Sequence, residues 1–171
     1  MRSTFRIPTR WLMPALLSAA LVACAPAPIY KAPVGAVIAT PMQVSQSPER
    51  YNGGDVIWGG RIVQVTNLSD HSEVEVLAYA LDGSQRPKPS DAGSGRFVVV
   101  MRGYVEPLDY PAGALMTVSG KLSGSHAGKV GEADYVFPLV SATQTHVWTQ
   151  KELNQGRNNV SFGVGLGVGI H

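Results

Sequence analysis

Cys24 is the residue of this chain best placed for covalent chemistry, because it is the only cysteine among 171 residues. A single thiol cannot form an intramolecular disulfide, so its use must be alkylation, acylation or packing. It ends an uncharged stretch, residues 11–24, which follows three arginines at Arg2, Arg6 and Arg10. Basic residues, a short apolar segment and then small residues are typical of a secretory signal peptide.

The residues around Cys24 resemble the bacterial lipobox, in which an aliphatic, a variable and a small residue precede a cysteine. Residues 21–24 read Leu-Val-Ala-Cys. The resemblance implies a cleaved signal peptide and an S-diacylglycerol with an N-acyl group such as palmitate on Cys24. Two or more acyl chains anchor a protein stably, whereas the apolar run is shorter than the roughly 20 residues of a spanning helix. The alternatives are a buried core cysteine or an ordinary signal peptide.

The residue after the cysteine bears on location. Gram-negative lipoproteins that stay in the inner membrane commonly carry aspartate there, whereas this chain has Ala25. The resemblance therefore implies lipid anchoring in the outer membrane, on its periplasmic face. The chain has 14 Lys+Arg and 12 Asp+Glu, and three of the arginines lie in residues 1–23. The mature chain is near neutral without a basic run, which argues against nucleic acid as a partner. The expected partners are the membrane and, as an open possibility, another envelope protein.

Composition divides the chain into four predicted parts. Residues 1–23 form the cleaved signal, 24–53 the lipidated cysteine and a tether, 54–150 a β domain and 151–171 a glycine-rich tail. Five of the twelve prolines lie within residues 25–48, and proline-rich segments extend by about 3 Å per residue. Pairing of residues 35–40 as an edge strand is the alternative. The tail alternates glycine with aliphatic residues, which fits either a packed ribbon or a flexible segment.

Five runs rich in β-branched and aromatic residues predict strands. The runs are residues 55–65, 73–81, 96–102, 114–122 and 129–136, and a glycine-serine turn over 123–128 is expected to join the last two. No helical period is sustained. The pattern predicts an all-β domain, a small closed or partly open antiparallel barrel of five to six strands, OB-like in having a longer connection over 103–113. Gly59 and Gly60 are interpreted as a bulge or barrel corner, with weak-strand noise as the alternative.

The sequence offers little for catalysis. None of the four histidines has a second histidine or cysteine at metal-ligand spacing, and no serine sits in a nucleophile elbow. We therefore predict no enzyme, no catalytic residue, no metal and no cofactor beyond the covalent lipid. A speculative ligand face comprises Trp58, Arg61, Tyr79 and Arg96, because aromatics beside arginines suit a glycan, a lipid head group or a small metabolite. The same residues equally suit a core rim with snorkelling arginines.

An ordered series of short motifs runs through the predicted β domain: Trp58-Gly59-Gly60-Arg61-Ile62, Glu75-Val76-Leu77, Tyr79, Leu81-Asp82, Arg86-Pro87, Gly95-Arg96-Phe97, Thr117-Val118, Gly120, Gly131-Glu132, Tyr135, Pro138, His146 and Trp148. By this series, over residues 55–148 and the lipobox, the chain resembles the Slp family of starvation-inducible outer-membrane lipoproteins. Gln85, where glycine is expected before Arg86-Pro87, and residues 105–107 depart from the family pattern. The resemblance implies an envelope lipoprotein without established catalysis. The predicted function is thus a non-enzymatic protein of envelope structure or stress adaptation, and the alternative is a ligand-binding module.

Overall fold

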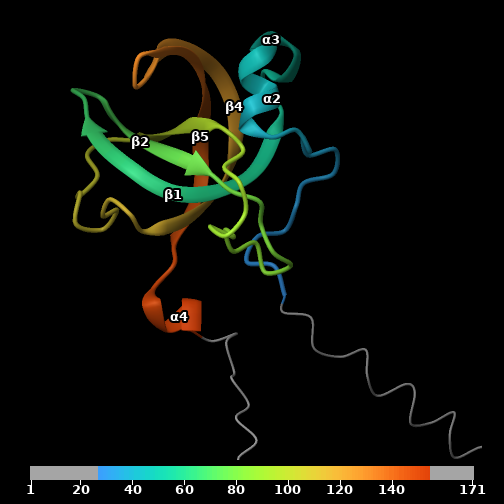
Figure 1. Cartoon of the computed structure of the whole chain (residues 1–171), viewed down its shortest axis with the longest axis vertical. Helices are drawn as coiled ribbons and strands as arrows, with labels where there is room; N and C mark the ends of the chain where they lie inside the picture. The colour runs from blue at the N-terminus through green and yellow to red at the C-terminus, as the bar shows by residue number, and fades with distance from the viewer. Residues whose placement is uncertain (1–26, 155–171) are drawn as a thin grey trace, which may run out of the picture.

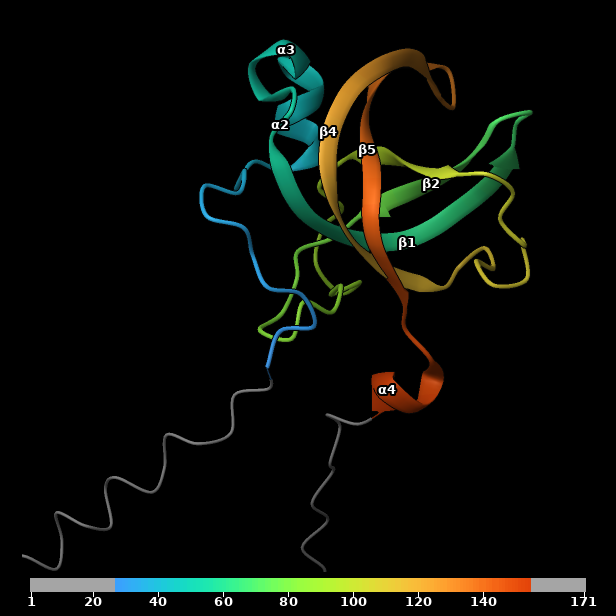
Figure 2. The same cartoon turned by 180° about the vertical axis from the view of Figure 1, so that it is seen from behind.

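The computed structural model describes residues 27–154 (Figures 1 and 2). Cys24 and the glycine-rich tail therefore lie outside the described residues. No helix within residues 27–154 has the length and apolar character needed to cross a membrane. The elements in chain order are α2 (Pro41–Gln46), α3 (Pro48–Tyr51), β1 (Asp55–Asn67), β2 (His71–Ala78), β3 (Arg96–Arg102), β4 (Leu115–Val130), β5 (Ala133–Val147) and α4 (Gln150–Asn154).

The five strands follow one another around a closed ring in the order β1-β2-β3-β5-β4. This confirms the predicted small all-β barrel, and the order is that of an OB-like Greek key. The prediction that every pair is antiparallel is wrong for one pair, because β3 and β5 run parallel from Val98↔Leu139 to Val100↔Ser141. The reason is parity: when an odd number of strands alternate in direction around a closed ring, one neighbouring pair must point the same way.

The last two strands are longer than the sequence predicted. The prediction of a turn at 123–128 and a strand at 129–136 is wrong, because β4 continues through Val130 and the chain reverses at Gly131 and Glu132. The β4–β5 register shifts between Leu122 and Ser125, and Gly124 there has a φ of +120°. The glycine-serine cluster thus forms an irregularity inside a strand, where a residue without Cβ permits the bend.

The barrel interior is filled by side chains that alternate along each strand. Trp58 and Phe97 pack edge to face at its centre, with ring centroids 5.2 Å apart. Gly60 is required where β1 pairs with both β2 and β4, because a Cβ there would overlap the Leu77 carbonyl. The inward residues of the strands are Val56, Trp58, Ile62, Val74, Val76, Ala78, Phe97, Val99, Met116, Val118, Leu122 and Val140.

Residues 37–51 belong to the folded domain, so the prediction of a tether over 25–48 is wrong for its second half. The Val37 amide donates to the Asp55 carbonyl at 2.8 Å, and the Trp58 indole donates to the Ala39 carbonyl at 3.1 Å. Val44 of α2 is 1% exposed and joins the core cluster. The helix pair α2–α3 packs beside the barrel (Figure 2). The buried indole needs an acceptor and the core needs covering, and this segment supplies both.

Candidate functional site

A polar groove on the outside of the barrel is the candidate site. It lies between the outer face of β1, β2 and β3 and the long β4–β5 hairpin, with a volume of about 230 Å³. In OB-like barrels the face of strands 2 and 3, with the loops beside it, binds oligonucleotides and oligosaccharides. We call it the outer-face groove. It is lined by Gln64, Thr66, Glu73, Glu75, Val98, His126, Gly128, Lys129 and Phe137.

Glu75 is the fixed negative charge of the outer-face groove. Its side chain is 14% exposed and forms an ion pair with Arg96 at the start of β3. Its second oxygen accepts a hydrogen bond from the Gln64 amide at 2.9 Å, across the β1–β2 pair. Because both oxygens are engaged and Arg96 balances the charge, Glu75 contributes a rigid wall rather than a free base.

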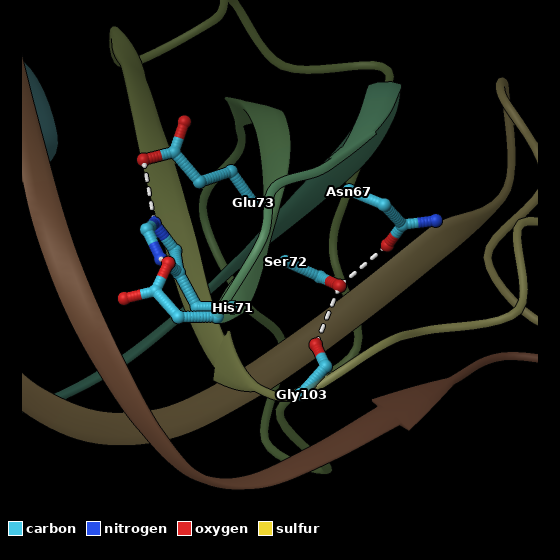
Figure 3. A network of polar contacts seen from close by, with 6 residues as sticks. Asn67, His71, Ser72, Glu73 and Gly103 are labelled. Carbon is cyan, nitrogen blue, oxygen red and sulfur yellow. Dashed lines mark hydrogen bonds and ion pairs between the residues drawn. The ribbon is translucent and has the colours of Figure 1, made fainter.

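Glu73 presents a second carboxylate on the same outward face, two residues before Glu75. The His71 imidazole lies between two carboxylates. Asp70 Oδ1 is 2.7 Å from Nδ1, and Glu73 Oε1 is 3.4 Å from Nε2 (Figure 3). The hydrogen bond between His71 and Asp70 is the main cause that raises the pKa of His71 and lowers the pKa of Asp70. The other oxygen of Glu73 has no hydrogen-bond donor among residues 27–154 and remains open to a ligand hydroxyl or amine.

A buried serine fixes the strand connection beside this face. The Ser72 hydroxyl lies within hydrogen-bond distance of the Asn67 side-chain oxygen and 2.7 Å from the Gly103 carbonyl oxygen (Figure 3). The Val105 amide donates to the same hydroxyl at 3.0 Å. Ser72 is fully buried, so we assign it a structural role and not that of a nucleophile.

The hairpin forms the opposite wall of the outer-face groove. The exposed His126 ring lies over the buried Phe137 ring with centroids 5.4 Å apart. A Cβ at Gly128 would come within 2.9 Å of the Phe137 ring, so glycine lets the ring rest on the strand. Lys129 is exposed, and no salt bridge joins it to another of the described residues. Carboxylates thus face a cation and an imidazole across the groove.

The side chains that line the outer-face groove indicate which ligands it suits. Within the described residues, no three or more His, Cys, Asp or Glu side chains are grouped so that they could hold a metal ion. Two carboxylates on one wall disfavour phosphate groups, so an oligonucleotide is a poor match. Carboxylate, amide, hydroxyl and ammonium groups together match a ligand rich in hydroxyls. At about 230 Å³ the groove is smaller than the roughly 300–1,000 Å³ of typical ligand pockets, so it fits a unit of about one sugar ring.

The structure does not bring the four residues of the speculative ligand face together. Trp58 points into the core and is 7% exposed, whereas Arg61 points outward and donates to the Gly113 carbonyl at 2.9 Å. Tyr79 lines a different depression, beside residues 37–41. Only Arg96 reaches the outer-face groove, through Glu75. Trp58 and Arg61 are separated by an odd number of positions on one strand, which places them on opposite faces.

Sequence reasoning missed the groove residues themselves. The alternation Glu73-Val74-Glu75-Val76 does predict part of the groove, because it places two carboxylates on the solvent-facing side of one strand. Nothing in the sequence predicts that His126 and Lys129 lie opposite them, because that proximity depends on where the long hairpin bends.

Comparisons with known proteins identify a family and three relatives. The model of the outer membrane lipoprotein Slp family matches residues 21–164. A Haemophilus influenzae protein whose name assigns no role is 37% identical over 92 residues, covering 53% of this chain and 50% of that protein. The Escherichia coli lipoprotein YeaY is 31% identical over 107 residues, covering 63% and 55%. The Escherichia coli outer membrane protein Slp is 25% identical over 123 residues, covering 71% and 65%.

These relatives limit what can be carried over. The match to the first two spans only about half of their length. None of the three names describes an enzyme. No solved structure matches this chain.

Proposed function

This chain belongs to the Slp family of outer membrane lipoproteins, and we propose that acylated Cys24 holds it on the periplasmic face of that membrane. There it acts without catalysis, and its barrel supports the envelope under stress such as starvation. The observation that carries the proposal is the position of Cys24: the lipobox-like residues 21–24 stand at the start of the region that the family model matches.

An envelope role predicts a measurable defect when the chain is absent. We expect a strain lacking it to become more sensitive to detergent after starvation, and the wild-type chain to restore resistance. The matched control is a version with an ordinary cleavable signal, released into the periplasm without lipid, which should not restore resistance. Survival after detergent exposure measures the effect. Equal survival of the deletion and wild-type strains would contradict the role in the envelope.

Saccharide binding in the outer-face groove is a second candidate function. It is favoured by the open oxygen of Glu73 opposite Lys129 and His126, in a groove that matches about one sugar ring. An uncharged saccharide presents hydroxyl and acetamido groups, which both donate and accept hydrogen bonds. Such ligands need several hydrogen bonds at once, which a mixed wall of donors and acceptors supplies.

A titration with oligomers of N-acetylglucosamine tests this second function. We expect amide chemical shifts to move in β2, in β3 and at residues 126–129, and Glu73→Ala to weaken binding about tenfold, which corresponds to roughly 1.4 kcal/mol. Glu132→Ala is the matched control, since this exposed glutamate lies at the hairpin turn outside the groove. Shifts scattered over the surface, or equal binding by both variants, would exclude saccharide binding at this groove.

A further inference from the structure

Residues 81–87, part of the connection between β2 and β3, pack against the barrel and are called the closing loop. The Thr117 hydroxyl of β4 donates to the Gln85 carbonyl at 2.7 Å, and Leu81 and Pro87 lie beside Gly59 of β1. The Asp82 carboxylate organises the closing loop by accepting hydrogen bonds from the Ser84 hydroxyl at 2.6 Å and from the Ser84 and Arg86 amides, each at 2.9 Å. Burial raises the pKa of Asp82, but these hydrogen bonds outweigh it and hold the pKa below its usual value. These hydrogen bonds fix the conformation of the closing loop.

Gln85 joins the closing loop to Tyr30 in the N-terminal part of the described chain. Its side-chain oxygen accepts from the Tyr30 amide at 2.8 Å, and its side-chain nitrogen donates to the Tyr30 carbonyl at 2.9 Å. Gln85 has a φ of +66°, a conformation that favours glycine. The positive φ explains why glycine would suit this position. A glutamine there adds two side-chain hydrogen bonds to the Tyr30 backbone.

Tyr30 is thereby fixed to the folded domain. Its side chain is 9% exposed, and burial, followed by the nearby Tyr110, raises its pKa to about 12. Cys24 lies six positions earlier, and six residues span at most about 20 Å when fully extended. An acylated Cys24 would therefore hold the closing loop within about 20 Å of the lipid surface. A free tether of residues 24–53 would allow a much larger distance between the anchor and the folded domain.

The same end of the molecule carries an apolar groove of about 650 Å³, the end groove. Residue 27 and α4 both emerge at this end, away from α3 and the β4–β5 turn (Figures 1 and 2). Leu108 borders the end groove and is 83% exposed. Arg86 ties α4 to the closing loop, since its guanidinium lies 5.3 Å from the Trp148 ring and donates to the Leu153 carbonyl at 3.3 Å. The apolar side chains of the end groove are Pro89, Leu108, Pro111, Ala114, Leu115, Val147, Trp148 and Leu153.

We propose that this end faces the bilayer and that Leu108 and the end groove contact lipid of the leaflet that holds the anchor. The proposal rests on acylation of Cys24, because only a lipid-anchored Cys24 limits the distance between the closing loop and the membrane. Leu108 lines the apolar end groove, so the two form one apolar surface instead of a scattered exposed side chain, and such a surface marks a contact site. An acylated Cys24, six residues before Tyr30, would bring this surface close to the lipid. The charged lining residues Arg61 and Asp109 are opposite in sign and leave the lining without net charge, so we expect added salt to change the contact little. The Gln85–Tyr30 pairing sets the orientation, and the β4–β5 turn points away from the membrane.

Site-specific fluorescence tests the orientation. Full-length acylated protein with Leu108→Cys is labelled with an environment-sensitive fluorophore and reconstituted into vesicles of phosphatidylethanolamine and phosphatidylglycerol that contain spin-labelled lipid. We expect a blue shift and strong quenching at position 108, unchanged by added salt. Ala127→Cys, exposed on the hairpin, is the matched control and should show neither. Equal spectra and equal quenching at the two positions would overturn the proposal.

Two further measurements separate the possible failures. Flotation of the unlabelled protein with the vesicles reports the anchor itself: a chain that does not float overturns the proposed anchoring, and the orientation with it. Gln85→Gly removes the two bonds to Tyr30 while relieving the positive φ, so the variant should fold and float but lose the quenching at position 108. If it floats and retains full quenching, the assignment of Gln85 as the orienting residue is overturned.

Discussion

Cys24→Ser is expected to leave the chain as an uncleaved precursor that takes up no fatty acid. A thiolate is a far better nucleophile than a neutral hydroxyl near neutral pH, so the serine is not alkylated by diacylglycerol. Without that modification the peptidase that cleaves before a lipidated cysteine has no substrate, and the chain loses the acyl chains that would hold it in the membrane. Labelling with radioactive palmitate, followed by electrophoresis and membrane fractionation, measures all three effects.

The matched control for this change is Ala25→Ser, which introduces the same hydroxyl one position later and leaves the thiol intact. It should be labelled and cleaved like the wild type. A Cys24→Ser chain that still incorporates palmitate, or a wild-type chain that begins at Met1 with a free thiol, is incompatible with the proposed anchoring.

Val44→Asp is expected to destabilise the domain by about 4 kcal/mol, because it places an unpaired carboxylate among apolar core groups. Val44 is 1% exposed and packs in the same cluster as Trp58 and Phe97. Since the free energy of unfolding of a small domain is only about 5–15 kcal/mol, such a loss leaves the protein close to unfolding. Urea denaturation followed by tryptophan fluorescence measures the change, because the Trp58 ring lies in this cluster.

Met42→Asp provides the control within the same short helix. Met42 is 43% exposed, so a charge there should change the free energy of unfolding by no more than about 0.5 kcal/mol. A free tether would tolerate both substitutions equally. Similar urea midpoints for the two variants would thus refute the assignment of α2 to the folded domain.

The error over the tether has a readable cause. Prolines suggested an extended segment, yet Pro41 and Pro48 each begin a helix, where the missing amide costs nothing. Thr40 and Gln43 form a capping box at the start of α2, a pattern present in the sequence. What the sequence could not indicate is that the Trp58 indole needs the Ala39 carbonyl, because that pairing joins residues brought together only by folding.

The sequence predicts one wall of the outer-face groove, whereas the other wall depends on the tertiary structure. Strand periodicity places Glu73 and Glu75 on one outward face and separates Trp58 from Arg61, because side chains alternate along a strand. The wall opposite the glutamates depends on the β4–β5 hairpin, whose glycine-serine run at 123–128 proved to be an irregularity inside β4 instead of a turn. The hairpin thereby became long enough to bring His126 and Lys129 to the groove.

The sequence alone predicted the local features: a lone cysteine behind an export-type segment, and four runs with strand propensity that overlap β1, β2, β3 and the first part of β4. These depend on neighbours in the chain, so residue type and spacing suffice to predict them. Tertiary structure decided which strand closes the ring, where the hairpin bends, and that Gln85 holds Tyr30 fifty-five positions away. Such contacts arise from packing between segments distant in sequence, where the need to satisfy buried polar groups selects partners that no local pattern specifies.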